Sequence, residues 1–351
     1  MSIGIGIGII GSGGISRAHA EAYRQLPKDA HIVAVSDIDA QRAREAASSW
    51  GVEHAFEDYR ELLDLEAVDA VSVCTYTRAH CAPVVAALQA GKHVLVEKPM
   101  AATTAEAWEM VQAARASTGL LMVEMKWRFM PQLLAARQAI ARGDLGTLYY
   151  AEALGWQHRG IPGRSFIRRE LAGGGALMDN GIYTLDAALY LMGHPRPLTV
   201  SGAAANIFGH AADATWDTRA FSVEDFGTAF VRLEGGITLS FAHSWAINFK
   251  DQWQVRIAGA QGAAEIYPFA PAPGLRITQG GYGDLQDVTP AVLPAGSTEI
   301  AYAVGKFVQA IQNGTPSPVP GDTFLYSNAI FDALYQSAQE GREVVVELPG
   351  D

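Results

Sequence analysis

A lysine stands between a glutamate and a proline at the end of an apolar run. The run is HVLV, and Glu97, Lys98 and Pro99 follow it directly. An ammonium at the end of a buried strand can hold an anion or assist proton transfer, although a lysine at a strand end is by default solvated. Proline removes a backbone donor and narrows the conformations of the residue before it, which suits a side chain whose direction must be held.

A carboxylate and a phenol share one face of a predicted helix in GGGALMDNGIYTLDAALYLMG, residues 173–193. Asp179 and Tyr183 lie at i and i+4 and face the same way, beside a buried apolar stripe. From this segment alone, a half-buried helix whose tyrosines reach water is the simpler interpretation. The glycines before it allow a ligand or another backbone to approach the helix start. The apolar stripe consists of Met178, Ile182, Leu185, Leu189 and Met192.

A glycine-rich turn, GSGGISRAH, follows the first apolar run of the chain. Gly11 and Gly13 match the first two glycines of a dinucleotide fingerprint, where the turn must be tight and the backbone must approach a pyrophosphate. Gly14 and Ile15 of the same turn belong to the predicted cofactor site. The third fingerprint position is Ser16, which departs from the usual glycine or alanine, so the turn alone is weak evidence.

Asp37 ends the next apolar run, about 20 residues beyond the glycines, where a carboxylate can accept both ribose hydroxyls. Its charge would repel a 2′-phosphate, so we expect NAD, with NADP as the second choice. Capping of the helix that begins near Ala40 is the other role open to Asp37, and the two are compatible. Thr75 and His80 follow a later strand, at the edge where ligands bind in doubly wound folds, although a histidine there more often begins a helix.

Short β-branched runs alternate with alanine-rich segments through residue 125. Such alternation indicates a parallel sheet covered by helices on both faces. We therefore predict an α/β fold class with a dinucleotide-binding Rossmann domain, a doubly wound parallel sheet, over residues 1–126. The predicted strands are Ile3–Ile10, His31–Ser36, Ala70–Cys74, His93–Val96 and Leu120–Glu124, and the helices between them include Ala40–Trp50, Ala79–Ala90 and Thr104–Ser117.

Beyond the RFMP motif the rhythm changes. One helix (Gln132–Arg142) and a strand near Leu148–Leu154 precede a long helix after Gly175, and the runs TAFVRL, ITLSFAHSW and WQVRIAG then follow without helices between them. Consecutive strands predict a large open, mostly antiparallel sheet. Residues 127–351 are thus predicted to form an α+β domain for substrate binding and oligomerisation, which includes a last helix over Thr323–Glu340.

Composition narrows the range of partners. The chain has 351 residues, with 26 Lys and Arg against 37 Asp and Glu and a net charge of -11. No long basic run interrupts this acidic background, which argues against nucleic acid and anionic membranes and favours a small molecule. Cys74 and Cys81 lie outside any metal-ligand spacing, so we expect no metal site and a reduced, cytoplasmic protein. No run approaches the roughly 20 apolar residues that span a bilayer.

Five motifs together resemble a known family. GSGGISRAH, AGKHVLVEKPM, RFMP, GDLGTL and GGGALMDNGIYTLD are similar, in order and spacing, to the glucose-fructose oxidoreductase / inositol dehydrogenase / MocA family of nicotinamide-dependent dehydrogenases. The resemblance covers most of the chain, from Ile3 to about Val346. It implies that Lys98 is catalytic, that the Lys98–Pro99 bond is commonly cis, and that Asp179 belongs to the catalytic set.

The family usually has a histidine where this chain has Tyr183. A tyrosine there resembles the branch with glucose-fructose oxidoreductase, aldose dehydrogenases and dimeric dihydrodiol dehydrogenase. The unperturbed pKa of tyrosine is ~10, but a neighbouring ammonium favours the phenolate, and Lys98 would supply it. The expected reaction is hydride transfer from a carbinol carbon to nicotinamide while Tyr183, assisted by Lys98, takes the hydroxyl proton. Asp179 would orient a substrate hydroxyl, and Glu97 would fix Lys98 beside the cofactor.

The rest of the substrate pocket is predicted from GWQHRGIPGRSF, which combines an aromatic face with several donors and so suits a polyhydroxylated ring. A core tryptophan and a solvated loop are the alternative interpretation, and Trp245 and Asn248 are weaker candidates. The candidates in this stretch are Trp156, His158, Arg159 and Arg164.

The resemblance leaves several functions open. We expect an aldose or pyranose substrate; the alternatives are an inositol, an anhydro- or keto-sugar, a dihydrodiol, or a regulator that binds nicotinamide nucleotide without turnover. The presence of Lys98, Asp179 and Tyr183 together favours an enzyme. An open sheet must hide its outer face, so we also expect a homodimer or homotetramer formed through the second domain.

Overall fold

The computed structural model describes residues 4–350 and divides the chain into two compact units. The first runs to Lys126 and also contains Thr298–Phe324; the second comprises Trp127–Ser297 and the chain from Leu325 onward. The sequence analysis placed residues 298–324 in the second domain. They belong to the first unit because helix α9 (Ile300–Asn313), which was not predicted, packs against helix α1 (Gly14–Arg24).

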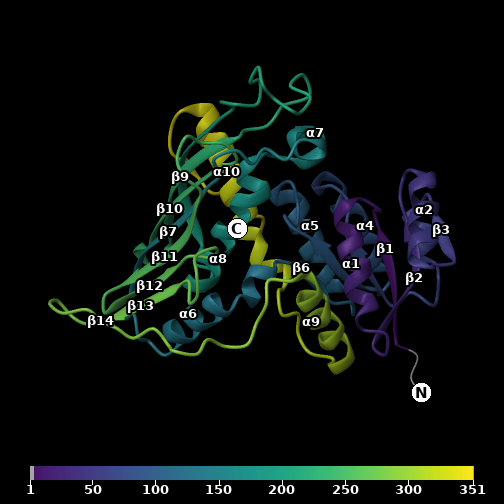
Figure 1. Ribbon diagram of the computed structural model, residues 1–351, viewed down its shortest axis with the longest axis horizontal. Helices are drawn as coiled ribbons and strands as arrows, with labels where there is room; N and C mark the ends of the chain where they lie inside the picture. Colours follow the sequence, from purple (N-terminus) through teal and green to yellow (C-terminus); the bar gives the residue numbers. More distant parts are fainter. Residues whose placement is uncertain (1–3, 351) are drawn as a thin grey trace. The chain divides into compact units, whose positions relative to one another are not determined.

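The first unit is built on a six-stranded parallel sheet in the order β3-β2-β1-β4-β5-β6 (Figure 1). The chain reverses its direction of sheet growth between β1 and β4, which is where doubly wound folds bind ligands. The predicted Rossmann fold is confirmed, β3 was not predicted, and the predicted start at Ile3 lies outside the described residues. The strands are β1 (Ile5–Ile10), β2 (Ala30–Ser36), β3 (His54–Phe56), β4 (Ala70–Val73), β5 (His93–Glu97) and β6 (Leu121–Glu124).

Both faces of this sheet are covered, as the unbroken apolar character of its central strands requires. Ile7 and Ile9 of β1 and Val94 and Val96 of β5 are completely buried. The remaining helices of the unit are α2 (Ala40–Trp50), α3 (Tyr59–Leu63), α4 (Cys81–Gln89) and α5 (Thr104–Ala116).

The second unit is built on a nine-stranded sheet in the order β14-β13-β12-β11-β7-β10-β9-β8-β15. Only the β7–β10 pair is parallel among the pairings of the described residues, so the prediction of a large, mostly antiparallel sheet is confirmed. The strands are β7 (Leu148–Trp156), β8 (Pro197–Ala205), β9 (Phe226–Leu233), β10 (Thr238–Ser244), β11 (Gln252–Gly259), β12 (Gly262–Ile266), β13 (Leu275–Gln279), β14 (Gln286–Asp287) and β15 (Val344–Val345).

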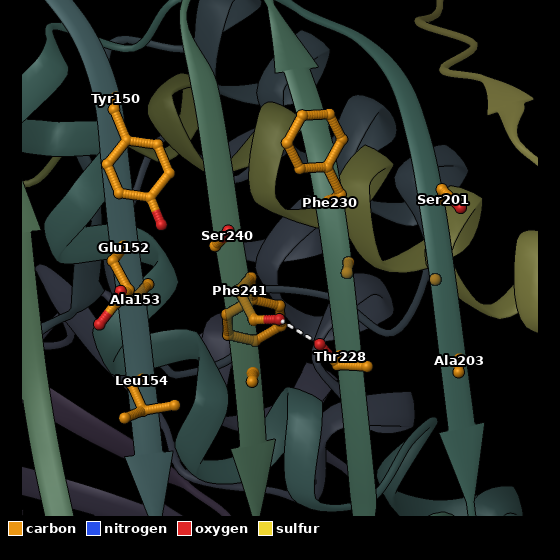
Figure 2. A pocket seen from close by; sticks show the side chains of 13 residues that line it. Tyr150, Glu152, Ala153, Leu154, Ser201, Ala203, Thr228, Phe230, Ser240 and Phe241 are labelled. Carbon is orange, nitrogen blue, oxygen red and sulfur yellow. Dashed lines mark hydrogen bonds between the residues drawn. The ribbon is translucent and has the colours of Figure 1, made fainter.

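Helices cover one face of this second sheet and leave the other open (Figure 1). Along β9, Ala229 and Val231 are buried beneath the helices, whereas Thr228 and Phe230 between them are exposed on the outer face (Figure 2). This alternation is the pattern of a sheet that is apolar on one side only. The helices are α6 (Pro131–Ala141), α8 (Ile182–Met192) and α10 (Leu325–Glu340), with the short α7 (Arg169–Ala172). Across residues 4–350, every helix is too short or too polar to cross a bilayer.

Candidate active site

The glycine-rich turn at the end of β1 presents open backbone at the start of α1. Gly11 has φ +90°, and a Cβ there would lie 2.9 Å from the carbonyl carbon of Cys74, so the tight turn requires glycine. No atom of the described residues lies within 4 Å of a Cβ added to Gly13 or Gly14. Ser16, the departure from the fingerprint, is completely buried and donates its hydroxyl hydrogen bond to the carbonyl of Gly13 at 2.6 Å. A helix N-terminus with accessible backbone is suited to an anionic group.

Asp37 at the end of β2 faces this turn. Its Oδ2 accepts hydrogen bonds from the backbone N–H and the hydroxyl of Ser12, both at 2.8 Å. The side chain that caps α2 is Asp39, which accepts from the N–H groups of Gln41 and Arg42. The capping role considered for Asp37 therefore belongs to Asp39, and Asp37 is held at the glycine-rich turn by Ser12, a partner that the sequence analysis missed.

His80 connects the segments around Thr75 and Pro99 through hydrogen bonds of its ring. Its ring is buried, with Nδ1 3.0 Å from the carbonyl oxygen of Pro99 and Nε2 3.2 Å from that of Thr75. Burial lowers the pKa of His80, so the ring is neutral. The hydroxyl of Thr75 donates to the carbonyl of Ala79 at 3.1 Å. His80 thus links the end of β4 to the chain that follows Lys98.

Lys98 follows β5 directly and is half-buried, and its peptide bond to Pro99 is cis, as the resemblance implied. The backbone N–H of Lys98 donates to Glu97 Oε2 at 3.2 Å, while Glu97 Oε1 lies 2.9 Å from His19 Nε2. Burial opposes charge on both groups, but His19 lowers the pKa of Glu97, and Cys74 and Glu97 raise that of His19. Glu97 and His19 form a buried ion pair that fixes the backbone of Lys98.

Asp179 lies on a π-helical turn, Leu177–Gly181, and not in the continuous α-helix that was predicted. α8 begins only at Ile182, so the extra residue in the π-helical turn changes the register between Asp179 and Tyr183. Asp179 Oδ2 accepts a hydrogen bond from the indole Nε1 of the completely buried Trp245 at 3.1 Å. Trp245, a weaker candidate from the sequence, therefore positions the Asp179 carboxylate.

The residue next to Asp179 also contacts the sheet. Asn180 Nδ2 donates to Gln157 Oε1 at 3.2 Å. The sequence analysis missed Gln157, although it stands within the stretch chosen for the pocket. Its position directly after a strand was the only signal that could have identified it.

Tyr183 lies beside a cluster of aromatic rings. The centroid of Trp127 is 5.1 Å from that of Tyr183, at an interplanar angle of 31°. Trp127 in turn contacts Trp253 at 5.8 Å and Phe269 at 6.0 Å, both edge to face. Phe269 is 70% exposed, so the cluster reaches solvent. None of these three residues was predicted, although Trp127 directly precedes the RFMP motif.

The glycines before the π-helical turn leave room for other parts of the protein to pack closely against them. A Cβ on Gly175 would lie 1.9 Å from the carbonyl oxygen of Glu224, and one on Gly174 would lie 2.2 Å from the hydroxyl of Tyr335. Glu224 Oε1 accepts the N–H groups of Gly175 and Leu177, at 2.9 and 3.2 Å. Of the two explanations offered for these glycines, close approach of another backbone accounts for Gly175.

A buried ion pair anchors α8. Arg128 donates from Nε and Nη2 to the two carboxylate oxygens of Asp186, at 3.0 and 2.6 Å, and the side chains are only 3% and 2% exposed. Arg128 directly follows Trp127, and Asp186 lies three residues after Tyr183. The same short turn therefore holds α8 through the ion pair and through the ring contact on Tyr183.

Two family models match successive parts of the chain. One, described as "Oxidoreductase family, NAD-binding Rossmann fold", matches residues 5–125, and the other, "GFO/IDH/MocA C-terminal domain", matches residues 133–265. Trans-1,2-dihydrobenzene-1,2-diol dehydrogenase of Bos taurus is 32% identical over 76% of this chain and 81% of its own length. The chain belongs to the GFO/IDH/MocA family.

Other relatives of this GFO/IDH/MocA protein are enzymes named for carbohydrates. D-glucoside 3-dehydrogenase of Escherichia coli (strain K12) is 29% identical and aligns over 96% of both chains. The crystal structure of aldose-aldose oxidoreductase from Caulobacter crescentus, complexed with glycerol, superimposes with a TM-score of 0.80 at 26% identity, covering 98% of this chain and 100% of the other. The protein is an NAD-dependent dehydrogenase that acts on CH–OH groups.

Trp156 of the GFO/IDH/MocA protein lies on the sheet face opposite to α8. A Cβ on Gly155 would come within 2.2 Å of the ring of His243, a residue that also packs against Gly181 of the π-helical turn, so alternation turns Trp156 the other way. Trp156 stacks there on Phe226, with centroids 6.1 Å apart. The structure therefore does not bring Trp156 to Tyr183.

The other loop residues predicted for the substrate pocket are exposed. The backbone N–H of His158 donates to Asp251 Oδ1 at 2.6 Å, and Arg159 Nη2 donates to Asn248 Oδ1 at 3.0 Å. Arg164 is exposed and has a positive φ of 54°. These contacts join the loop after β7 to the loop after β10.

A broad cavity of about 670 Å³ lies on the outer face of the second sheet (Figure 2). Tyr150, Glu152, Thr228 and Phe230 line it from β7 and β9. None of the residues predicted for the active site belongs to its lining. Over the described part of the chain, no cluster of three or more His, Cys, Asp or Glu side chains is arranged to hold a metal ion.

Proposed function

We propose that the protein oxidises a CH–OH group of a sugar or sugar-like polyol, with an aldose or pyranose as the first choice. The observation that carries this proposal is Tyr183, which follows an Asp179 carboxylate held by an indole N–H and lies against the Trp127 ring. The names of the relatives, a glucoside dehydrogenase and an aldose-aldose oxidoreductase, support the substrate class.

The cofactor site of the proposal is the glycine-rich turn with Asp37. The open backbone of Gly13 and Gly14 suits the pyrophosphate, and Asp37 suits the ribose hydroxyls of NAD and disfavours the 2′-phosphate of NADP. Gly11 shapes the turn, and Ile15, 37% exposed, lies on its surface. Bound nicotinamide supplies the hydride acceptor.

The proton transfer of the proposal rests on three side chains. Tyr183 removes the proton of the hydroxyl group that is oxidised, and the ammonium of Lys98 favours the phenolate that can do so. Asp179, oriented by Trp245, accepts a hydrogen bond from a substrate hydroxyl. The exposed Phe269 and its neighbouring rings offer an apolar wall to the carbon face of the substrate.

A dihydrodiol is the second candidate substrate. The ring cluster beside Tyr183 suits an unsaturated carbocycle as well as a pyranose, and the relative from Bos taurus is named for such a substrate. The loop residues His158, Arg159 and Arg164 stay candidates for binding the hydroxyl groups of a sugar. A dihydrodiol has only two hydroxyl groups and needs fewer hydrogen-bond donors, so these three side chains favour the sugar.

The test is nicotinamide absorbance on mixing the protein with NAD or NADP and a panel of aldoses, pyranosides, inositols, anhydrosugars and a dihydrodiol. We expect reduction of NAD by an aldose or pyranoside, and at least about a 100-fold loss in Lys98→Met, since one proton-transfer group contributes 10²–10⁴. Binding of NAD, measured by calorimetry, should change little. Retained turnover in Lys98→Met would remove Lys98 from the mechanism, and NAD binding without turnover of any substrate would favour a regulator.

We also propose that the protein forms a homodimer or homotetramer through the outer face of the second sheet. Phe230 and Val345 are 39% and 69% exposed there, beside the cavity. Sedimentation should show an oligomer for the natural protein and a smaller species for Phe230→Asp. An unchanged sedimentation coefficient would place the interface elsewhere. Phe166→Asp is the matched control, because its ring is 42% exposed and lies on the turn Arg164–Ile167, outside the second sheet.

A further inference from the structure

Two buried carboxyl groups stand side by side at the ends of β5 and β6. Glu97 and Glu124 are register partners on these adjacent parallel strands, and they are 6% and 1% exposed. Register partners lie ~4.8 Å apart and point to the same face of the sheet. Two buried carboxyl groups that project side by side from neighbouring strands oppose each other's ionisation, so one of them is favoured in its protonated form.

The surroundings decide which carboxyl keeps its proton. His19 Nε2 lies 2.9 Å from Glu97, and the other nitrogen of His19 lies 3.2 Å from the hydroxyl of Ser72. Glu124 Oε1, in contrast, has no hydrogen-bond partner among the described residues. The charge therefore belongs to Glu97 and the proton to Glu124. In agreement, burial first and Glu97 second raise the pKa of Glu124 to about 8.

Lys98 is coupled to both carboxyls. Its positive charge lowers the pKa of Glu97 and also opposes the rise in that of Glu124. Because such coupling is reciprocal, ionisation of Glu124 must stabilise the ammonium of Lys98 and weaken the positive potential that the ammonium exerts on other groups. While Glu124 is neutral, Glu97 is the charged member of this carboxyl pair beside Lys98.

Other charged groups around Glu124 are few. Lys126 follows on the same segment and lowers the pKa of Glu124 slightly, and Glu124 contributes to the raised pKa of the buried thiol of Cys74. Helix α9 and the 3₁₀ turn Gly321–Phe324 also pack on β6. Their charged side chains, Lys306 and Asp322, reach solvent.

We propose that Glu124 is a positioning residue for the reaction: as an uncharged acid beside the His19–Glu97 pair, it sets the electrostatic strength of the Lys98 ammonium, and its ionisation attenuates that strength. The proposal rests on the proposed catalytic role of Lys98. With Glu124 neutral, the ammonium acts at full strength on the phenolate of Tyr183. Once Glu124 is charged, part of this effect is cancelled, so turnover stops rising with pH.

The first test is a titration that does not depend on turnover. In protein labelled with ¹³C at Glu Cδ and Lys Cε, the Glu124 carboxyl signal, identified by its loss in Glu124→Gln, should titrate near pH 8. The Lys98 signal, identified by its loss in Lys98→Met, should show an inflection at the same pH that Glu124→Gln abolishes. A Glu124 carboxyl that titrates below pH 5, or a Lys98 signal unaffected by Glu124→Gln, would overturn the proposal. If Glu124→Gln does not fold, Glu124→Asp identifies the signal.

The second test is the pH profile of turnover. Glu124→Gln, which fixes the neutral form, should match the natural enzyme at pH 7 and continue to gain activity above pH 8, where the natural enzyme levels off. Glu66→Gln, the same change at an exposed position of the same unit, should leave the profile unaltered. Identical profiles for Glu124→Gln and the natural enzyme would refute the role of Glu124. If the two ¹³C signals are coupled while Lys98→Met retains activity, the proposed function fails and the charge coupling stands.

Discussion

One buried charged cluster in each unit invites comparison, because the two are built in different ways. In the second unit, Arg128 and Asp186 form a closed pair in which both carboxylate oxygens are bound. In the first unit, His19 and Glu97 are paired while Glu124 beside them has a carboxyl oxygen without a hydrogen-bond partner in the described residues. Arginine keeps its charge at any pH at which proteins fold, whereas two carboxyls and an imidazole share protons that can move.

The Arg128–Asp186 pair therefore acts as a fixed structural support, whereas the cluster of His19, Glu97 and Glu124 is expected to respond to pH. The Arg128–Asp186 pair holds α8, and with it Tyr183, through two charge-assisted hydrogen bonds. We expect the cluster at the ends of β5 and β6, beside Lys98, to change its charge near pH 8. Intact buried ion pairs contribute little net stability. The first arrangement therefore matters because it fixes the position of α8, and the second because it adjusts the electrostatic effect of Lys98.

Breaking the closed pair should have the largest effect on stability. Arg128→Leu leaves Asp186 buried without its partner, and we expect a loss of about 3–5 kcal/mol in the free energy of unfolding by urea. Arg142→Leu, which removes an arginine whose side chain is 62% exposed from its pairing with Asp144, should cost less than about 1 kcal/mol. A similar small loss in Arg128→Leu would show that α8 does not depend on the pair.

Fixing the proton of Glu124 should change stability in a way that depends on pH. The folded pKa of Glu124, about 8, lies above its unfolded value, so folding retains a proton that the unfolded chain releases. The contribution of Glu124 to stability must therefore fall as the pH rises from about 4.3 to 8, by at most roughly 1.4 kcal/mol for each pH unit, and Glu124→Gln must lack this contribution. Urea unfolding of both proteins at pH 5.5, 6.5 and 7.5 measures the difference. Parallel curves would mean that Glu124 is charged in the folded protein.

Much of the fold could be predicted because its signals are local. Buried parallel strands appear as β-branched runs, and the one-sided second sheet appears as alternation, so both sheets were expected. β3 has only three residues, too few for a periodic signal, and α9 joins the first unit through contacts with α1, nearly 300 residues away in the chain. Sequence periodicity cannot reveal that a helix so late in the chain packs against the first unit.

In the candidate site, too, local motifs could be predicted from the sequence, whereas contacts between distant segments could not. Lys98, Asp179 and Tyr183 could be named because motifs place them at strand and helix ends. The partners that orient two of these side chains could not, since the hydrogen bond from Trp245 to Asp179 and the ring contact of Trp127 with Tyr183 join segments more than fifty residues apart. The π-helical turn has no local signature either, because only Met178 of the predicted apolar stripe lies in it, while the other four members lie in α8 and keep their α-helical spacing.

Removing the indole N–H that orients Asp179 should have a smaller effect, confined to substrate binding. Trp245→Phe deletes one hydrogen bond to a carboxylate, which is worth about 1.5 kcal/mol, so kcat/KM should fall roughly tenfold, mainly through KM. Trp216→Phe is the matched control, since Trp216 packs on the same apolar cluster but donates to the carbonyl of Gly209. Both variants lose packing, whereas only Trp245→Phe removes a hydrogen bond from Asp179. Equal kinetic losses in the two variants would mean that Trp245 acts through the packing of the core and not through its hydrogen bond to Asp179.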